Sequence, residues 1–195
     1  MQFKLKICDN ILTDGNVYEY FCSFISLKNE YLFVYGTKSY SLEFYDLSKL
    51  KIIKIINMHT SKINSVRHYL DDNTKKDLVI SSSNDKTINV WECDKYTNIF
   101  NITHEKPIIT ANIIFLENEM YIVGAGDNDY LNIWDKNKKK IANFGDASIT
   151  NRRSEIFYLE NYSLIIVSGT KGVNIYDFNT KKIFKNFLEI NDTSY

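Results

Sequence analysis

Residues 81–92 read SSSNDKTINVWE, a polar turn followed by a strand that ends in an aromatic residue and an acid. The same ending occurs in three further segments, namely SLEFYD (41–46), YLNIWD (130–135) and GVNIYD (172–177). The aromatic positions are separated by 46, 43 and 42 residues and are Tyr45, Trp91, Trp134 and Tyr176. This regular spacing indicates an internal repeat of about 43 residues.

Each repeat contains four short strand candidates. A short apolar run and a tight polar or glycine-containing turn precede each ending, which is the pattern of a β-hairpin. Another apolar segment precedes each hairpin, and a fourth follows each ending after a polar turn. These segments are rich in β-branched and aromatic residues, and no helical periodicity of comparable length is present. The sequence therefore predicts an all-β chain with four antiparallel strands in each repeat.

Four antiparallel strands in a repeat of about 40–45 residues with a Trp-Asp ending resemble the WD-repeat family of β-propellers. The second repeat, which runs from Met58-His59 to Glu92, carries the motif most fully. The resemblance implies a β-propeller or partial propeller of about four blades, within a single WD-repeat domain over residues 1–195. The implied repeats are 15–58, 59–103, 104–145 and 146–188, with residues 3–7 as an extra N-terminal strand.

The resemblance also implies a structural hydrogen-bonded set in the second repeat. Its members would be His59 before the blade, Ser82 or a neighbouring serine on the second strand, Asp85 in the hairpin turn, and Trp91. Such a relay would satisfy a buried imidazole and a buried indole, which need hydrogen-bond partners. The other repeats depart from this pattern. The third has His104 but carries Asn128 where the turn aspartate belongs, and the glycine-histidine pair is replaced by Gly145-Asp146 in the fourth and by Asp14-Gly15 in the first.

The number of repeats does not determine whether the blades form a closed ring. Closed propellers typically have about 4–8 blades, so four lie at the lower limit. The chain could close into a small ring, or a second copy or partner chain could complete a larger one. It could also be half of a longer gene product. An open array would expose apolar faces and strand edges, which favour association.

Composition narrows the class of partner and the compartment. Lysine plus arginine equals aspartate plus glutamate at 24 each, so no global field attracts nucleic acid or an anionic membrane. Cys8, Cys22 and Cys93 are odd in number and form no CxxC pair. We find no secretory signal and no apolar run of about 18 residues. These features predict a cytoplasmic protein that does not bind nucleic acid.

No catalytic or metal-binding pattern emerges from the sequence. There is no GxSxG elbow and no phosphate-binding GxxxxGK[ST] loop. His59 and His104 belong to the repeat pattern, and His68 lies within a strand candidate. Asp127 and Asp129 could hold a hard cation, but a hairpin turn explains their Asp, Asn and Gly neighbours better. We therefore expect no enzyme activity, metal or cofactor.

The resemblance implies a scaffold that binds proteins or peptides through its loops. The partner-binding candidates are Tyr40, Lys62, Lys86, Tyr130, Arg152 and Arg153, with Lys38, Lys106 and Lys171 placed similarly. Aromatic and arginine residues are favoured because they dominate interface energetics. The alternative is phosphoinositide or anion binding through Arg152 and Arg153, since adjacent arginines capture lipid headgroups in one branch of propellers. The zero net charge disfavours this membrane role.

Overall fold

The computed structural model describes residues 17–27, 30–126, 131–144, 155–169 and 172–188. Within these residues the chain forms 16 strands and one short 3-10 helix. The strands are β1 (Val17–Leu27), β2 (Glu30–Thr37), β3 (Leu42–Asp46), β4 (Lys51–Ile56), β5 (Ile63–Asp71), β6 (Lys76–Ser83), β7 (Thr87–Glu92), β8 (Thr97–Thr103), β9 (Ile108–Leu116), β10 (Glu119–Gly126), β11 (Leu131–Asp135), β12 (Lys140–Phe144), β13 (Glu155–Leu159), β14 (Leu164–Gly169), β15 (Gly172–Asp177) and β16 (Lys182–Leu188). The helix η1 (Glu160–Tyr162) connects β13 to β14.

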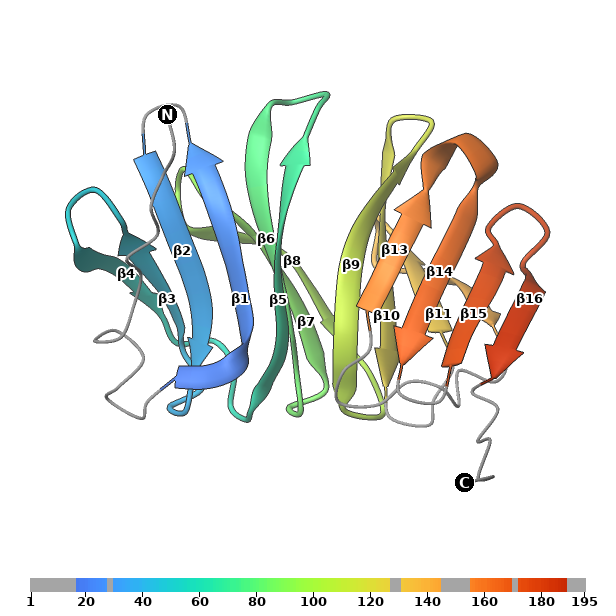
Figure 1. Cartoon of the computed structure of the whole chain (residues 1–195), viewed down its shortest axis with the longest axis horizontal. Helices are drawn as coiled ribbons and strands as arrows, with labels where there is room; N and C mark the ends of the chain where they lie inside the picture. The colour runs from blue at the N-terminus through green and yellow to red at the C-terminus, as the bar shows by residue number, and fades with distance from the viewer. Residues whose placement is uncertain (1–16, 28–29, 127–130, 145–154, 170–171, 189–195) are drawn as a thin grey trace, which may run out of the picture.

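Consecutive strands form four antiparallel four-stranded sheets. Sheet 1 contains β1–β4, sheet 2 β5–β8, sheet 3 β9–β12 and sheet 4 β13–β16, each in sequence order. The sheets stand side by side, with sheets 1 and 4 at opposite ends of the array (Figure 1). The predicted fold class is confirmed as an all-β partial propeller of about four blades. The predicted extra strand at residues 3–7 lies outside the described residues.

Alternation along the third strand of each sheet explains how the sheets stack. Successive side chains of a strand point to opposite faces. In β7, Ile88 and Val90 pack toward sheet 3, whereas Trp91 packs toward sheet 1. We call the face turned toward the next sheet along the chain the leading face, and the opposite one the trailing face. The repeated aromatic residue thus lies on the trailing face.

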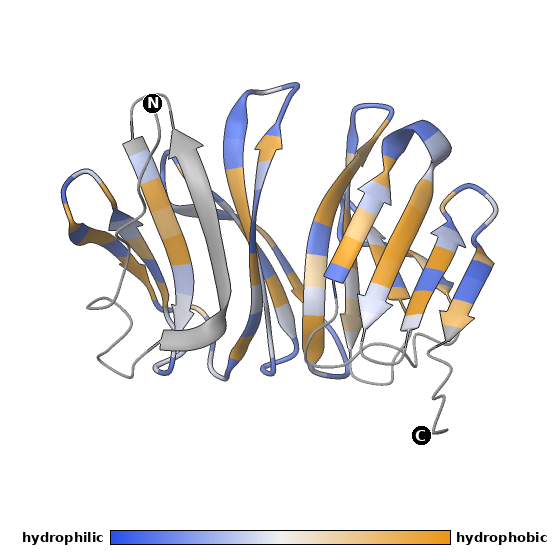
Figure 2. Ribbon diagram, in the orientation of Figure 1, coloured by the Kyte–Doolittle hydropathy of each residue, from blue (hydrophilic) through white to orange (hydrophobic). Residues whose placement is uncertain are grey.

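The core consists of three apolar layers, one between each pair of consecutive sheets. Trp91 lies in the layer between sheets 1 and 2, Trp134 between sheets 2 and 3, and Tyr176 between sheets 3 and 4. All three aromatic side chains are buried. Hydrophobic residues concentrate in the strands, as Figure 2 shows. Burial of these layers is the main force that holds the stack together.

The acid that follows the aromatic residue organises the turn between the third and fourth strands. Asp46 Oδ1 accepts hydrogen bonds from the backbone N–H groups of Ser48 and Lys49, at 2.8 and 2.9 Å. Asp177 Oδ1 accepts equivalent bonds from Asn179 and Thr180, at 2.8 and 3.0 Å. Aspartate is suited to this role because its short side chain reaches backbone two or three residues ahead. The aromatic-acid ending therefore combines a core residue with a turn residue.

Polar side chains tie the first strands of neighbouring sheets together. Asn64 of β5 donates to the carbonyl oxygen of Ile108 at 2.8 Å, and Asn112 of β9 donates to that of Ile156 at 2.9 Å. Arg67 of β5 reaches further and forms an ion pair with Glu155 of β13. The first strands of sheets 2, 3 and 4 are therefore linked across the array as well as through its apolar layers.

Candidate functional site

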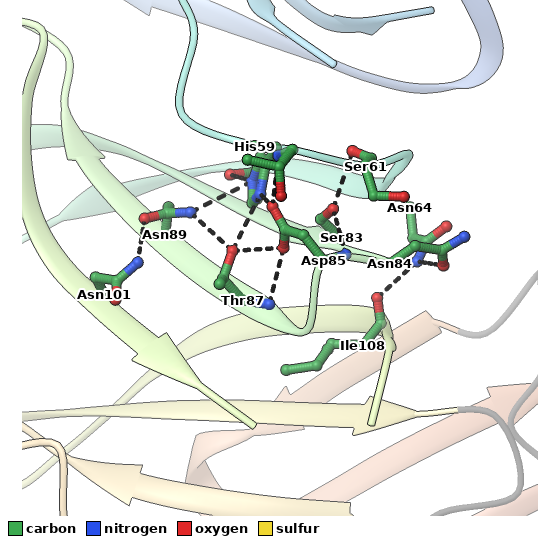
Figure 3. Close-up of polar contacts among 12 residues, drawn as sticks. His59, Ser61, Asn64, Ser83, Asn84, Asp85, Thr87, Asn89, Asn101 and Ile108 are labelled. Carbon is green, nitrogen blue, oxygen red and sulfur yellow. Dashed lines mark hydrogen bonds and ion pairs between the residues drawn. The ribbon is translucent and has the colours of Figure 1, made fainter. Parts of the chain in front are cut away.

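A hydrogen-bonded network joins the β4–β5 loop to the β6–β7 hairpin (Figure 3). His59 Nδ1 lies 2.8 Å from Asp85 Oδ2, and His59 Nε2 lies 2.8 Å from Ser81 Oγ. Asp85 also accepts from the backbone N–H of Thr60 at 2.9 Å and from the Thr87 hydroxyl at 2.7 Å. The single carboxylate of Asp85 therefore holds both the loop and its own hairpin.

The electrostatics of the network indicate a neutral imidazole beside an ionised carboxylate. Burial lowers the pKa of His59 below its usual range, although Asp85 acts in the opposite direction. Burial acts to raise the pKa of Asp85, but hydrogen bonds from Thr87, Thr60 and His59 outweigh it and leave that pKa lowered. With Asp85 ionised, His59 donates from Nδ1, and Nε2 accepts from the Ser81 hydroxyl.

The structure identifies which of the predicted serines binds His59, and it removes Trp91 from the hydrogen-bonded set. The serine bound to His59 is Ser81, whereas Ser82 Oγ lies 2.7 Å from Ser65 Oγ. Strand alternation is the reason, because Ser81 shares the trailing face with Trp91 while Ser82 points to the leading face. Trp91 is buried near the network, but its Nε1 has no hydrogen-bond partner among the described residues. His59, Ser81 and Asp85 thus form the relay, and Trp91 contributes packing.

The order of groups, serine to histidine to aspartate, has the hydrogen bonds of a catalytic triad. Nucleophilic catalysis also requires a serine oxygen that a substrate carbonyl can reach. Ser81 is fully buried within the middle of sheet 2, with Val66 and Asn89 as its strand partners. The relay therefore suits a structural role, in which it fixes the loop and hairpin, better than an attack on a substrate.

Among the described residues the relay occurs only in the second sheet, and the strand register gives the reason. Ser81 pairs with Asn89, and the residues at the equivalent positions of the other sheets are Tyr35, Gly124 and Val167. None of these residues has an aliphatic hydroxyl at the Ser81 position. In sheet 3, His104 instead packs edge-on to the Trp134 ring, with ring centroids 5.9 Å apart.

The network continues along the trailing face through residues that the sequence did not single out. Asn89 donates to Thr87 Oγ1 at 3.2 Å, and Asn101 donates to Asn89 Oδ1 at 2.8 Å. Asparagine is frequent throughout this chain, so its presence in TINVWE carried little signal. The alternation that places Asn89 beside Ser81 is the signal that could have identified it.

Several predicted partner-binding residues lie together at one end of the sheets. We call this end the loop face and define it by residues 37–41, 57–62, 84–87 and 103–107, along the lower edge of Figure 1. Tyr40 lies in the β2–β3 hairpin, Lys62 in the β4–β5 loop and Lys86 in the β6–β7 hairpin. Tyr40 and Lys86 are exposed, and Lys62 is half-buried. Tyr130, Lys171, Arg152, Arg153 and the Asp127–Asp129 turn lie outside the described residues.

Positive charge dominates this loop face. Each of its four segments contributes one lysine, and these are Lys38, Lys62, Lys86 and Lys106. Its two acids are Glu105, which is exposed, and Asp85, whose carboxylate is already occupied by His59. The chain has no net charge, so this face is a local cationic patch.

A cleft at the other end of sheets 2 and 3 lacks such a bias. It is lined by residues that include Lys76, Glu92, Glu119 and Lys136. Lys76 pairs with Glu92 and Lys136 with Glu119, each at 2.7 Å. The described residues contain no cluster of three or more His, Cys, Asp or Glu side chains suited to a metal ion. No helix in the same residues has the length and apolar character needed to cross a bilayer.

Comparison with known proteins agrees with this geometry. Residues 50–92 match the family model described as WD domain, G-beta repeat, and they include the complete His59–Ser81–Asp85 relay. No curated protein matches the chain. WD repeats typically mediate protein–protein interactions and are generally non-catalytic. The matched repeat, together with the four antiparallel four-stranded sheets, supports the assignment of the chain to the WD-repeat family.

Proposed function

We propose that the chain is a non-catalytic interaction module that binds an acidic segment of a partner protein on its loop face. The observation that carries this proposal is the placement of Lys38, Lys62, Lys86 and Lys106 on four successive segments of one end. Opposite charges across an interface direct encounter and discriminate against other partners. An acidic peptide that crosses these segments would meet one lysine at each.

The loop face is also rigid enough to act as a binding surface. The β2–β3 hairpin is closed by a 2.7 Å hydrogen bond between the Thr37 and Ser41 hydroxyls. The β6–β7 hairpin is held by the Asp85–His59 pair and by a 2.8 Å bond from the Asn84 N–H to the carbonyl oxygen of Lys62. Segments that are already ordered lose less conformational entropy on binding.

Tyr40 supplies an apolar anchor within this cationic surface. Its backbone adopts a left-handed conformation with φ of 67°, and its N–H donates to the carbonyl oxygen of Thr37 at 3.1 Å. The turn thereby presents an exposed ring beside Lys38. Tyrosine is enriched among interface hot spots because it buries a large area with few rotatable bonds. The preferred ligand would therefore combine acidic residues with an apolar side chain.

A fluorescein-labelled peptide rich in Glu and Asp, with one Leu, tests the proposal by fluorescence anisotropy. The double variant Lys38→Glu/Lys86→Glu should weaken binding by about tenfold or more, which corresponds to about 1.4 kcal/mol. The matched control Lys51→Glu/Lys139→Glu makes the same charge change at exposed positions on the opposite end of the sheets. This control should bind as the parent chain does.

Comparison of the two double variants distinguishes binding at the loop face from a general effect of net charge. Equal weakening by the two double variants would show that only net charge matters and would overturn the proposal, as would the absence of binding to the parent chain. Vesicles that contain phosphoinositide test the alternative role predicted for Arg152 and Arg153. Vesicle binding that is lost in Arg152→Ala/Arg153→Ala, with no peptide binding, would favour that alternative.

A further inference from the structure

The leading faces of sheets 1, 2 and 3 are covered by the sheet that follows each of them. On their fourth strands, Ile56, Ile102 and Phe144 pair with equivalent positions of the third strand and are at most 8% exposed. In sheet 4 the equivalent residue is Phe187, which pairs with Val173. Phe187 is 46% exposed. A position that is core in three sheets is therefore open in the fourth.

The exposed area on the leading face of sheet 4 continues from β16 to β13. Phe157 pairs with Ile166, which in turn pairs with Ile175, so these side chains form a row from β13 to β15. Ile166 and Ile175 are half-buried, and Phe157 at the end of the row is 52% exposed. The equivalent third-strand residues Val90 and Ile133 are fully buried. Apart from Lys185, which pairs with Ile175, the leading face of sheet 4 thus carries apolar residues like those of a layer interface, but without a covering sheet.

The trailing face of sheet 1 shows the complementary feature. Tyr45 occupies the position of Trp91 and Trp134, but it is half-buried where they are buried. On the neighbouring strand, Ile52 pairs with Tyr45, and Ile55, which pairs with Glu43 on the same face, is 51% exposed. This face presents an aromatic residue and aliphatic residues, as do the trailing faces inside the stack.

Each internal layer of the chain joins one leading face to one trailing face. The two uncovered faces are the leading face of sheet 4 and the trailing face of sheet 1. These sheets lie at opposite ends of the array (Figure 1). The two faces are therefore the two halves of a fourth junction that requires a second array. We infer that two copies of this chain pack head to tail, with the leading face of sheet 4 in one copy against the trailing face of sheet 1 in the other.

Geometry limits the assembly to two copies. A head-to-tail interface repeats until it closes into a ring or continues as a fibre. Propeller rings have about 4–8 sheets, so two four-sheet chains reach the upper end and three would exceed it. The dimer has two equivalent junctions and leaves no open sheet face. This inference concerns the ends of the array and does not depend on peptide binding at the loop face.

The mass of the chain in solution tests the inference. Light scattering during size-exclusion chromatography should give twice the 22.9 kDa chain mass over a range of concentrations. The double variant Phe157→Glu/Phe187→Glu alters the leading face of sheet 4, and Ile52→Lys/Ile55→Lys alters the trailing face of sheet 1. Each variant alone should be monomeric, because both junctions of its dimer contain the altered face. Since these side chains are exposed, each monomer should still unfold cooperatively.

A mixture of the two variants provides the decisive readout. In a heterodimer, one junction pairs the introduced glutamates with the introduced lysines, and the other junction is unaltered. The mixture should therefore regain the dimer mass. The control Leu50→Glu/Tyr162→Glu changes two exposed apolar residues outside the strands, one in the β3–β4 turn and one in η1, and should remain dimeric.

Three results would overturn the head-to-tail dimer. One is a parent chain that stays monomeric at every concentration, which would mean that other residues of the chain, or a different chain, cover the open faces. Another is loss of the dimer in only one of the two variants, which would indicate contact between like faces. The third is a mixture that stays monomeric although both variants fold.

Discussion

Asp85 and His59 are 26 residues apart in the chain, yet their side chains meet at 2.8 Å. The contact joins the hairpin of sheet 2 to the loop that connects sheet 1 to sheet 2. Both side chains are almost fully removed from solvent, so each satisfies part of the other's hydrogen bonding in place of water. The geometry of the loop face therefore depends on this pair.

Removal of the Asp85 carboxylate should destabilise the fold. Asp85→Ala leaves the buried His59 Nδ1 and the Thr60 N–H without their acceptor. Hydrogen bonds to a charged group and the penalty for an unsatisfied buried partner together predict a loss of about 2–3 kcal/mol in the free energy of unfolding. Urea denaturation measures this loss. Asp94→Ala, at an exposed acid outside the network, should cost little, and equal losses in the two variants would contradict a special role for Asp85.

The buried histidine should make the chain sensitive to mild acid. Burial lowers the pKa of folded His59 below the 6.5 of the unfolded chain. As the pH falls through about 6.5, the unfolded state binds the proton first, so the free energy of unfolding decreases, by at most about 1.4 kcal/mol per pH unit for one group. The lowered pKa of Asp85 adds a further loss only below its usual value of 3.8.

The pH dependence can be assigned to His59 by comparing unfolding of the parent chain and of His59→Gln between pH 7.5 and 5.5. The parent chain should lose stability over this window, and the variant should lose less because it has one titrating group fewer. Parallel curves for the two chains would show that other groups control the response, and the predicted contribution of His59 would then be absent.

The spacing of the aromatic-acid endings predicted the repeat and the four-stranded sheets because both residues have fixed local roles. Trp91 fills the layer between sheets 1 and 2, and Asp46 or Asp177 caps a turn within its own repeat. The sequence does not determine whether the array of sheets is open or closed. The answer depends on what covers the leading face of sheet 4, and a local pattern contains no information about that cover.

The candidate site was predicted less completely than the fold. His59 and Asp85 follow from their positions in the second repeat, but the choice between Ser81 and Ser82 depends on the pairing register of the hairpin. A shift of one residue exchanges the two faces of a strand. The register is Ser81 with Asn89, and it becomes definite only when the turn geometry is known. Arg67 and Glu155 belong to different sheets, so no local pattern could have paired them.

Cys93 should resist thiol reagents in the folded chain. Its side chain is buried in the layer between sheets 1 and 2, and burial raises the pKa of its thiol. At neutral pH the reagent therefore cannot easily reach the sulfur of Cys93, and little of the thiol is in the reactive thiolate form. Brief treatment with iodoacetamide, followed by mass spectrometry of the peptide that contains Cys93, should show labelling in urea and little labelling without it. Rapid labelling of the native chain would contradict this burial.

Gly124 lies at a close contact between sheets 2 and 3. A Cβ at this position would lie 2.8 Å from Ile88 Cδ1 and 3.3 Å from the Trp134 ring. Gly124→Ala should therefore cost about 1–3 kcal/mol through overpacking. Ile88→Val removes Cδ1, so in that background the same substitution should cost much less, and urea unfolding of the double-mutant cycle measures the difference. If Gly124→Ala costs the same free energy of unfolding in the parent chain and in the Ile88→Val background, the contact with Ile88 Cδ1 contributes nothing to that cost. The strain would then arise from the contact with the Trp134 ring.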